Sequence, residues 1–198
     1  EYKDASGKKG KATIKYGNDG TYSLTKTING VTSESVFDKN GKLRQLTSKD
    51  SSTGNTTISK YDASGKINTK KVQDTKTGTV KTLNYYDDNG QLARKNAYNE
   101  GGKLAQTTDF EYDKNGKVTS ATIKIGNKTI KGANVKISKD GTITIKNKNG
   151  QVLAKISKNN KTGNTSVTEY DYSSKTARKK VYTIDENGDI TYHGTKYS

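Results

Sequence analysis

The sequence lacks four residue types entirely: cysteine, proline, methionine and tryptophan. Without cysteine, a disulfide framework and a thiolate-ligated zinc site are both excluded. No run of about 18 apolar residues occurs, so the sequence offers no candidate membrane span. The missing methionine leads us to expect a processed chain whose secretory signal has been removed, and hence an extracellular or cell-surface protein.

Large apolar residues are also scarce. Leu, Ile, Val and Phe number 31 of 198 residues, and the formal net charge is +16 at pH 7. A share of these residues below roughly 20%, combined with high net charge, is typical of disordered chains. We therefore do not expect an ordinary globular enzyme with one thick core. A folded chain of this composition must be stabilised by interactions other than those of a large apolar core.

A short repeat offers a source of that order. It consists of an aromatic residue, Asp, two variable residues, Gly, Lys or Gln, and an aliphatic residue. Clear copies span residues 37–43, 61–67, 86–92 and 112–118, and weaker copies span residues 2–8, 146–152 and 184–190. A second turn signal, such as Thr53-Gly54-Asn55, falls between the clear copies. Each repeat is therefore expected to hold two turns and two strands.

The repeat has the chemistry of a β-hairpin turn. Its Asp can bond to the nearby backbone, and its Gly suits the left-handed conformation that closes a three-residue hairpin loop. The turn glycines are Gly41, Gly65, Gly90 and Gly116. Runs rich in Thr, Val, Ile and Tyr flank the turns, as expected of β-strands, and no stretch keeps a helical apolar period. About 17 strands of ordinary length would account for the chain.

Alternation of apolar and polar residues is clearest in the second half of the chain. Residues 123–125 and 128–130 flank Gly126-Asn127 as a tight hairpin, and residues 135–137 are expected to pair with residues 143–145. Strands of the first half are polar on both faces, so neither face can be well buried. We predict an all-β fold, an elongated antiparallel meander of repeated hairpins in a single-layer or curled sheet, with little or no helix.

The repeat divides the sequence into three stretches. Residues 1–36 are expected to form N-terminal strands, residues 37–118 carry the regular hairpin repeats, and residues 119–198 continue the array in a Lys-rich form.

The Tyr-Asp-x-x-Gly-Lys-aliphatic motif resembles the YD-repeat family of bacterial Rhs and teneurin-like proteins, clearly over residues 37–118. That resemblance implies extended, curling β-sheets that sometimes close into shells. Family members more often carry Arg where this chain has Lys42, Lys66 and Lys117.

Two further resemblances are local. Residues 36–42 and 47–52 resemble Lys-rich hairpins of the free-standing sheet of spirochaete outer surface protein A, which implies a sheet that is wet on both faces. Residues 85–90 are similar to glucan- and choline-binding wall repeats. Ligand sites of those repeats depend on Trp, which this chain lacks.

Patterns that indicate catalysis or metal binding are sparse. His193 is the single histidine, so neither a catalytic triad nor a His-rich metal site can be built around it. The acidic turn at residues 185–189 lacks the spacing of a calcium loop. We therefore expect no enzymatic activity, no metal and no cofactor.

Four tyrosines occupy equivalent repeat positions: Tyr61, Tyr86, Tyr112 and Tyr170. On one face of a sheet they would form a ladder. Cross-strand aromatic contacts that stabilise a thin sheet are the commoner role of such residues. A stacking platform for sugars or bases is the alternative.

Positive charge is concentrated in residues 114–168, which contain twelve Lys and one acid, Asp140. A basic sheet face attracts polyanions. The candidate polyanion-binding residues are Lys124, Lys128, Lys131, Lys136, Lys146, Lys148 and Lys155. Lys also guards sheets against edge-to-edge pairing, so a merely solvated face is the alternative.

These observations lead us to expect a secreted or cell-surface structural β-repeat protein, with copies that assemble into filaments by pairing strand edges. The alternative is a binding module for anionic polymers, such as a wall polymer, a glycan or a nucleic acid, through residues 114–168. The expected partners are other copies of the chain and anionic cell-surface polymers.

Overall fold

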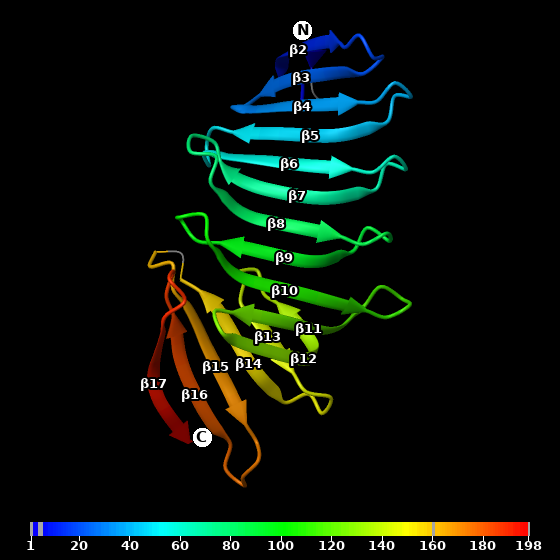
Figure 1. The fold of residues 1–198 in the computed structure, drawn as a ribbon. Coiled ribbons are helices and arrows are strands. Elements are labelled where there is room, and N and C mark those ends of the chain that lie inside the picture. The colour runs from blue at the N-terminus through cyan, green and yellow to red at the C-terminus, as the bar shows by residue number, and fades with distance from the viewer. Residues whose placement is uncertain (1, 4–5, 160, 198) are drawn as a thin grey trace. The chain divides into compact units, whose positions relative to one another are not determined.

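The computed structural model describes residues 2–3, 6–159 and 161–197. All regular structure in this part of the chain is β-strand, and no helix occurs in it (Figure 1). The strands form an antiparallel meander in which consecutive strands are joined by hairpin turns. The predicted all-β meander of repeated hairpins is therefore confirmed.

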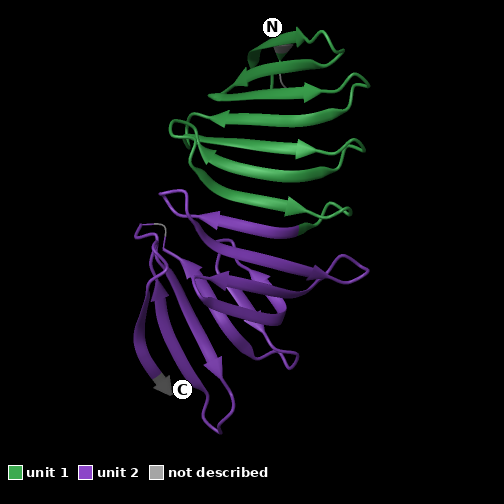
Figure 2. Ribbon diagram, viewed as in Figure 1, with its two compact units in different colours: residues 1–92 green, residues 93–198 purple. Residues whose placement is uncertain are grey.

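Contacts divide the chain into two compact units, Glu1–Leu92 and Ala93–Ser198, which we call unit 1 and unit 2 (Figure 2). Unit 1 contains β1 (Tyr2–Lys3), β2 (Lys9–Tyr16), β3 (Tyr22–Ile28), β4 (Val31–Phe37), β5 (Leu43–Asp50), β6 (Asn55–Tyr61), β7 (Ile67–Asp74) and β8 (Val80–Tyr86). Unit 2 contains β9 (Leu92–Tyr98) apart from its first residue, then β10 (Leu104–Tyr112), β11 (Val118–Ile125), β12 (Lys128–Ile137), β13 (Ile143–Lys146), β14 (Val152–Lys158), β15 (Thr165–Asp171), β16 (Arg178–Ile184) and β17 (Ile190–Tyr197). The predicted stretches 1–36, 37–118 and 119–198 follow the sequence motif and not this division.

The repeat motif forms the same hairpin turn each time. In the first clear copy, Asp38 Oδ1 accepts hydrogen bonds from the backbone N–H groups of Asn40 and Lys42, at 2.9 and 3.0 Å. Gly41 closes the turn with a φ of 77°, a region that L-residues rarely adopt. Phe37, at the start of the motif, lies opposite Leu43, at its end. The turn therefore brings the two apolar residues of the motif together across the hairpin.

Other copies repeat this geometry. The aspartates Asp62, Asp87, Asp113 and Asp185 each accept backbone N–H groups two and four residues later through Oδ1. The copy at residues 146–152 does so through Asn147. The copy at residues 2–8 includes residues 4–5, which lie outside the described part of the chain.

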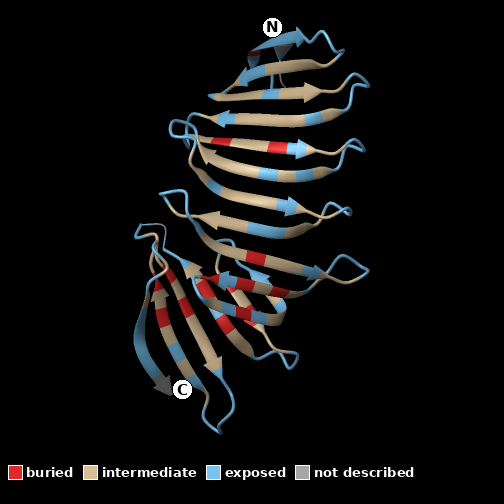
Figure 3. Ribbon diagram, in the orientation of Figure 1, coloured by how far each residue is buried: buried red, intermediate tan, exposed pale blue. Residues whose placement is uncertain are grey.

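Unit 1 is a sheet in which neither face is buried. Residues directly opposite one another on antiparallel strands lie on the same face. The register places Leu24 and Leu46 on one face, and Ile58 and Leu83 on the other, and all four are half-buried. Among its described side chains, those of Thr56 and Ser59 alone are buried (Figure 3). This agrees with the prediction that strands of the first half cannot bury one face.

Unit 2 does have a core. Its buried residues include Ile123, Ile145, Ile156, Val167 and Tyr182, and each of these five is at most 2% exposed. The register places Ile123 opposite Ile130, and Ile156 opposite Val167, as expected when one face collects the apolar side chains. We call this the inner face of unit 2 and the opposite one its outer face. The predicted pairing of residues 135–137 with residues 143–145 is also confirmed.

The sheet of unit 2 curls around that core. In a flat sheet, β12 and β16 would lie four strand spacings apart, about 19 Å. Lys128 Nζ on β12 is nevertheless 5.7 Å from the centre of the Tyr182 ring on β16. A Cβ added to Gly126, in the turn after β11, would lie 3.3 Å from the carbonyl oxygen of Gly188, in the turn after β16. Curling closes the inner face against water with few apolar residues.

Candidate polyanion-binding face

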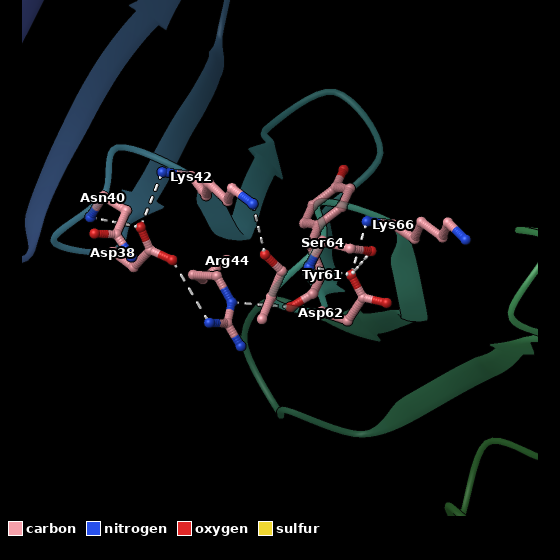
Figure 4. A network of polar contacts seen from close by, with 9 residues as sticks. Asp38, Asn40, Lys42, Arg44, Tyr61, Asp62, Ser64 and Lys66 are labelled. Carbon is pink, nitrogen blue, oxygen red and sulfur yellow. Dashed lines mark hydrogen bonds and ion pairs between the residues drawn. The ribbon is translucent and has the colours of Figure 1, made fainter.

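In unit 1, Lys and Arg side chains of one hairpin donate hydrogen bonds to the backbone of the next hairpin. Lys42 Nζ donates to the carbonyl oxygen of Ala63 at 3.2 Å, and Arg44 Nε donates to that of Tyr61 at 3.2 Å (Figure 4). One repeat later, Lys66 Nζ donates to the carbonyl oxygen of Asp88 at 2.8 Å. Lys42, Arg44 and Lys66 therefore connect each repeat to the following one through side-chain to backbone hydrogen bonds.

The repeat tyrosines Tyr61 and Tyr86 of unit 1 do not lie on neighbouring strands. Tyr61 and Tyr86 end β6 and β8, with β7 between them, and Ile67 of β7 lies opposite Tyr61. In the described part of the chain, ring contacts join Tyr22 to Tyr16 and Phe37, and Tyr182 to Tyr192. Tyr112 lies opposite Val118, and Tyr170 packs under Lys179 Nζ, which is 5.8 Å from the ring centre. Tyr61, Tyr112 and Tyr170 each have a non-aromatic neighbour across the strands, and a ladder of all four tyrosines stays a prediction.

Five of the seven candidate lysines lie on the outer face of unit 2. Four of them are next to a buried inner-face residue along the strand, and the fifth lies opposite a residue that has such a neighbour. Because successive side chains of a strand point to opposite faces, all five point outward. Lys124 lies between Ile123 and Ile125, and Lys155 lies between Ala154 and Ile156. The others are Lys131, which follows Ile130, Lys146, which follows Ile145, and Lys136, which lies opposite Thr144.

No acid accompanies these five lysines on β11 to β16. The two acids of β15, Glu169 and Asp171, alternate with the same phase as buried Val167 and so belong to the inner face. In the described residues, none of the five ammonium groups has a hydrogen bond or an ion pair with a side chain. Two outer-face acids lie on β10, where Asp109 is paired with Arg94 at 2.6 Å and Glu111 accepts a hydrogen bond from Ser120 Oγ, and Asp140 lies in the turn between β12 and β13.

The other two candidates lie elsewhere. Lys128 lies opposite Ile125 on the inner face, where its Nζ is 5.7 Å from the Tyr182 ring centre and 5.8 Å from that of Tyr192. Lys128 therefore contributes to packing of the curled sheet. Lys148 is exposed in the turn between β13 and β14. Sequence periodicity around Ile125 and Ile130 could have separated Lys128 from the outer set.

A groove of about 520 Å³ opens on unit 2 beside β12, β15 and β16. Glu169 lies directly opposite Lys180, and Asp171 directly opposite Arg178, so the acids of this groove face cations of the neighbouring strand. The Tyr182 hydroxyl is buried without a hydrogen-bond partner in the described part of the molecule. Burial, and then the Glu169 carboxylate, raise the pKa of Tyr182. The groove is nearly charge-balanced, since its lining holds Lys131, Arg178 and Lys180 with Glu169 and Asp171.

The remaining chemistry-bearing residues are tied into turns and strands. His193 Nε2 lies 3.0 Å from Thr183 Oγ1 on an exposed strand. Asp185 binds backbone of its own turn. The described residues hold no group of three or more His, Cys, Asp or Glu that could bind a metal ion. They also form no helix long and apolar enough to cross a membrane.

No protein-family model matches the chain, and no curated protein matches it. Among solved structures, 57% of the chain is similar to 21% of a point mutant of S. aureus TarM crystallised with fondaparinux, α-GlcNAc-glycerol and UDP, at 12% identity and a TM-score of 0.39. A second crystal structure of TarM gives 14% identity, a TM-score of 0.39, and coverage of 55% of this chain and 21% of that one. The chain spans about a fifth of the length of these structures, and likeness at this level carries no argument about function.

Proposed function

We propose that the protein is a secreted or cell-surface structural β-repeat protein whose copies join into filaments by pairing strand edges. Repeated hairpins support this proposal, because each one is hydrogen-bonded to its neighbour along the whole strand and through cations such as Lys42 and Lys66. Such an array is stabilised by contacts between neighbouring repeats and does not need a thick core.

The open edge of β2 is the observation that carries the assembly proposal. Residues 11–16 of β2 pair with β3 in continuous register, while β1 pairs with Lys9 and Gly10 alone. On that side, the described part of unit 1 leaves the backbone from Lys11 onward without a strand partner. Ile14 is 54% exposed and Tyr16 is 79% exposed. A regular edge with exposed apolar residues is a template for pairing with another chain.

The partner edge that we propose is β17 of another copy. Within unit 2, β17 pairs with β16. Its first three residues, from Ile190 to Tyr192, stay in regular register before the irregularity near Gly194. Pairing of β2 with β17 is heterologous, so it repeats from copy to copy, and it extends into a filament when the rotation between copies does not close a ring.

Assembly is tested by measuring sedimentation velocity over a range of protein concentrations, together with negative-stain microscopy. We expect species that grow with concentration and appear as filaments. Replacing both Ile14 and Tyr16 by Lys places two further charges on the edge and should leave monomers. A matched control replaces Leu104 and Ile137, which are also about half exposed, by Lys and should still assemble.

Two outcomes oppose the filament proposal. Monomers at every concentration exclude edge pairing, and a dimer that grows no further indicates a closed, symmetric contact instead. The location is tested separately, by adding protease to intact producing cells and following the chain with an antibody. Protection of the chain in intact cells, with cleavage after lysis, would contradict a cell-surface location.

A further inference from the structure

We propose that the outer face of unit 2 binds a linear acidic polysaccharide. The candidate surface is the row of outward lysines on β11 to β14, namely Lys124, Lys131, Lys136, Lys146 and Lys155. This proposal concerns a face of the sheet and does not depend on pairing of strand edges. It rests on charge complementarity and on the order in which side chains follow one another across the strands.

Ammonium and hydroxyl groups alternate across this face. One row crosses four strands, from β12 to β15, and each of its residues lies directly opposite the next: Lys136, Thr144, Lys155 and Thr168. A second row, from β10 to β12, runs from Thr107 through Lys124 to Thr129. Neighbouring strands are about 4.8 Å apart, so successive cations of a row are separated by about 10 Å, with a hydroxyl between them.

The cations of the outer face act together on a polymer. Their spacing is comparable to the Debye length of about 10 Å at 0.1 M salt, so their fields overlap at the surface. No carboxylate on β11 to β16 neutralises them, because both acids of β15 lie on the inner face. A long anion crossing the strands therefore meets several unpaired cations at once.

The side-chain chemistry favours a polysaccharide over a nucleic acid. Strands β11 to β14 contain neither an aromatic residue nor Arg. Single-stranded nucleic acids are held largely by stacking on aromatic rings, and Arg is the residue that recognises phosphate and base edges through paired donors. Threonine hydroxyls instead match the hydroxyl groups of sugar rings, while Lys supplies point charges for the acidic groups between them.

Binding is measured with the whole chain against two acidic polysaccharides, heparin and polygalacturonate, with neutral dextran and double-stranded DNA for comparison. We expect both acidic polysaccharides to bind more tightly than DNA, and dextran not to bind. Replacing Lys124, Lys136 and Lys155 together by Gln should weaken acidic polysaccharide binding at least tenfold. The slope of log affinity against log salt should become shallower by roughly 2, since each cation contributes somewhat under one unit.

A matched control removes the same charge elsewhere. Lys49, Lys60 and Lys70 are exposed strand residues of unit 1, and replacing them together by Gln should change affinity by less than about threefold. Circular dichroism and urea unfolding establish that both triple variants are folded; the single variant Lys155→Gln replaces the outer-face triple if that one unfolds. Equal loss in both triple variants would overturn the proposal, because affinity would then follow net charge alone.

The hydroxyl groups need a second test. Replacing Thr144 and Thr168 by Val keeps the branched shape of each side chain and removes its hydroxyl. We expect affinity for polygalacturonate to fall several-fold, while affinity for inorganic polyphosphate, which has no sugar hydroxyl groups, stays the same. An equal effect on both polymers, tighter binding of DNA through the same lysines, or no binding of either polysaccharide would each overturn the inference.

Discussion

At each clear repeat turn, a single carboxylate oxygen accepts two backbone N–H groups and a glycine takes up a left-handed conformation. Asp62 Oδ1 accepts the N–H groups of Ser64 and Lys66 at 2.9 and 3.0 Å, and Gly65 has a φ of 91°. Both features are local, because they involve residues within four positions of one another. They explain how a turn forms here without support from a core.

Gly65 should be needed for its backbone conformation alone. A Cβ at this position would have no atom within 4 Å, so a substitution causes no steric clash. Replacing Gly65 by Ala should still cost about 1–2 kcal/mol, because a Cβ disfavours the left-handed region. Urea unfolding measures this loss. Gly65→Asn is the control and should cost less, since Asn tolerates that region better; equal losses for Ala and Asn would contradict the explanation.

Asp62 should make the hairpin sensitive to acid. The Ser64 hydroxyl, and then the Lys66 N–H, lower the pKa of Asp62 below 3.8. The ionised carboxylate therefore stabilises the folded chain above pH 3.8, and this contribution declines as pH falls from 3.8 through the folded-state pKa. We expect the free energy of unfolding to decrease on acidification over that window, measured by urea titration at several pH values.

The amide at Asp62→Asn provides the control for this pH dependence. Its oxygen can still accept both N–H groups, but it does not titrate. The variant should therefore lose less stability on acidification than the natural chain. Asp19, Asp38, Asp50 and Asp74 in unit 1 also have lowered pKa values, so some dependence should remain. Identical pH profiles for the two chains would contradict a role for the Asp62 charge.

On the scale of single strands, alternation decides which residues are buried and which face water. In β11, Ile123 and Ile125 are buried while Lys124 between them is exposed, and β14 repeats this with Lys155. The side chains on one face of each strand therefore belong to the core, and those on its other face belong to the cationic surface. In unit 1 the apolar residues are divided between both faces, so its strands stabilise each other through hydrogen bonds and neighbouring side chains.

Gly132 should be required for close packing in the curled sheet. It lies opposite Ala121 on the inner face, and a Cβ there would overlap with Ile145 Cγ2. Replacing Gly132 by Ala should destabilise unit 2 by about 1–3 kcal/mol through overpacking. Replacing Ile145 by Ala should cost about 2–5 kcal/mol through the cavity that it leaves. Both losses are measured by urea unfolding.

Combining the two changes distinguishes packing from other causes. Removal of the Ile145 side chain makes room for the new Cβ at position 132. The double variant should therefore be less destabilised than the sum of the single variants, by a margin that a double-mutant cycle measures. Strict additivity would show that Gly132 is needed for a reason other than contact with Ile145.

On the scale of the whole molecule, each unit reaches order by a different route. Unit 2 encloses a core of isoleucine, valine and tyrosine side chains inside a curled sheet. Unit 1 has no buried hydrophobic residue among those described, and its order comes from the hairpin register, the turn aspartates and the lysine contacts between repeats. Local opening is easiest where few apolar contacts protect backbone hydrogen bonds.

Amide hydrogen exchange should reveal this difference. We expect the slowest exchange in β13, β14 and β15, whose inner-face residues are buried, and faster exchange in β2 and β3 of unit 1. Mass spectrometry of exchanged peptides measures both sets in one sample. Uniform protection over both units would mean that the exposed sheet gains its stability from contacts other than those described.

Much of the fold follows from local sequence patterns. The hairpin between residues 123–125 and 128–130 was predictable because Gly126-Asn127 separates two alternating runs, and it forms in that register. The core was not predictable, because regularly spaced apolar residues fit a flat sheet and a curled one equally well. Assigning Lys128 to the same surface as Lys124 failed to follow alternation, which turns Lys128 inward beside Tyr182.

The sequence by itself determined the turns, the strands and their order. Asp and Gly at fixed spacing set the backbone of each hairpin through contacts between residues that are neighbours in the chain. The tertiary structure alone decided that unit 2 curls and unit 1 does not. Curling brings Ile125 and Ile184 into one core from strands far apart in the sheet, and such long-range contacts leave no signal in the spacing of residues. By burying one face, the same curl leaves the lysines of the other face together in water.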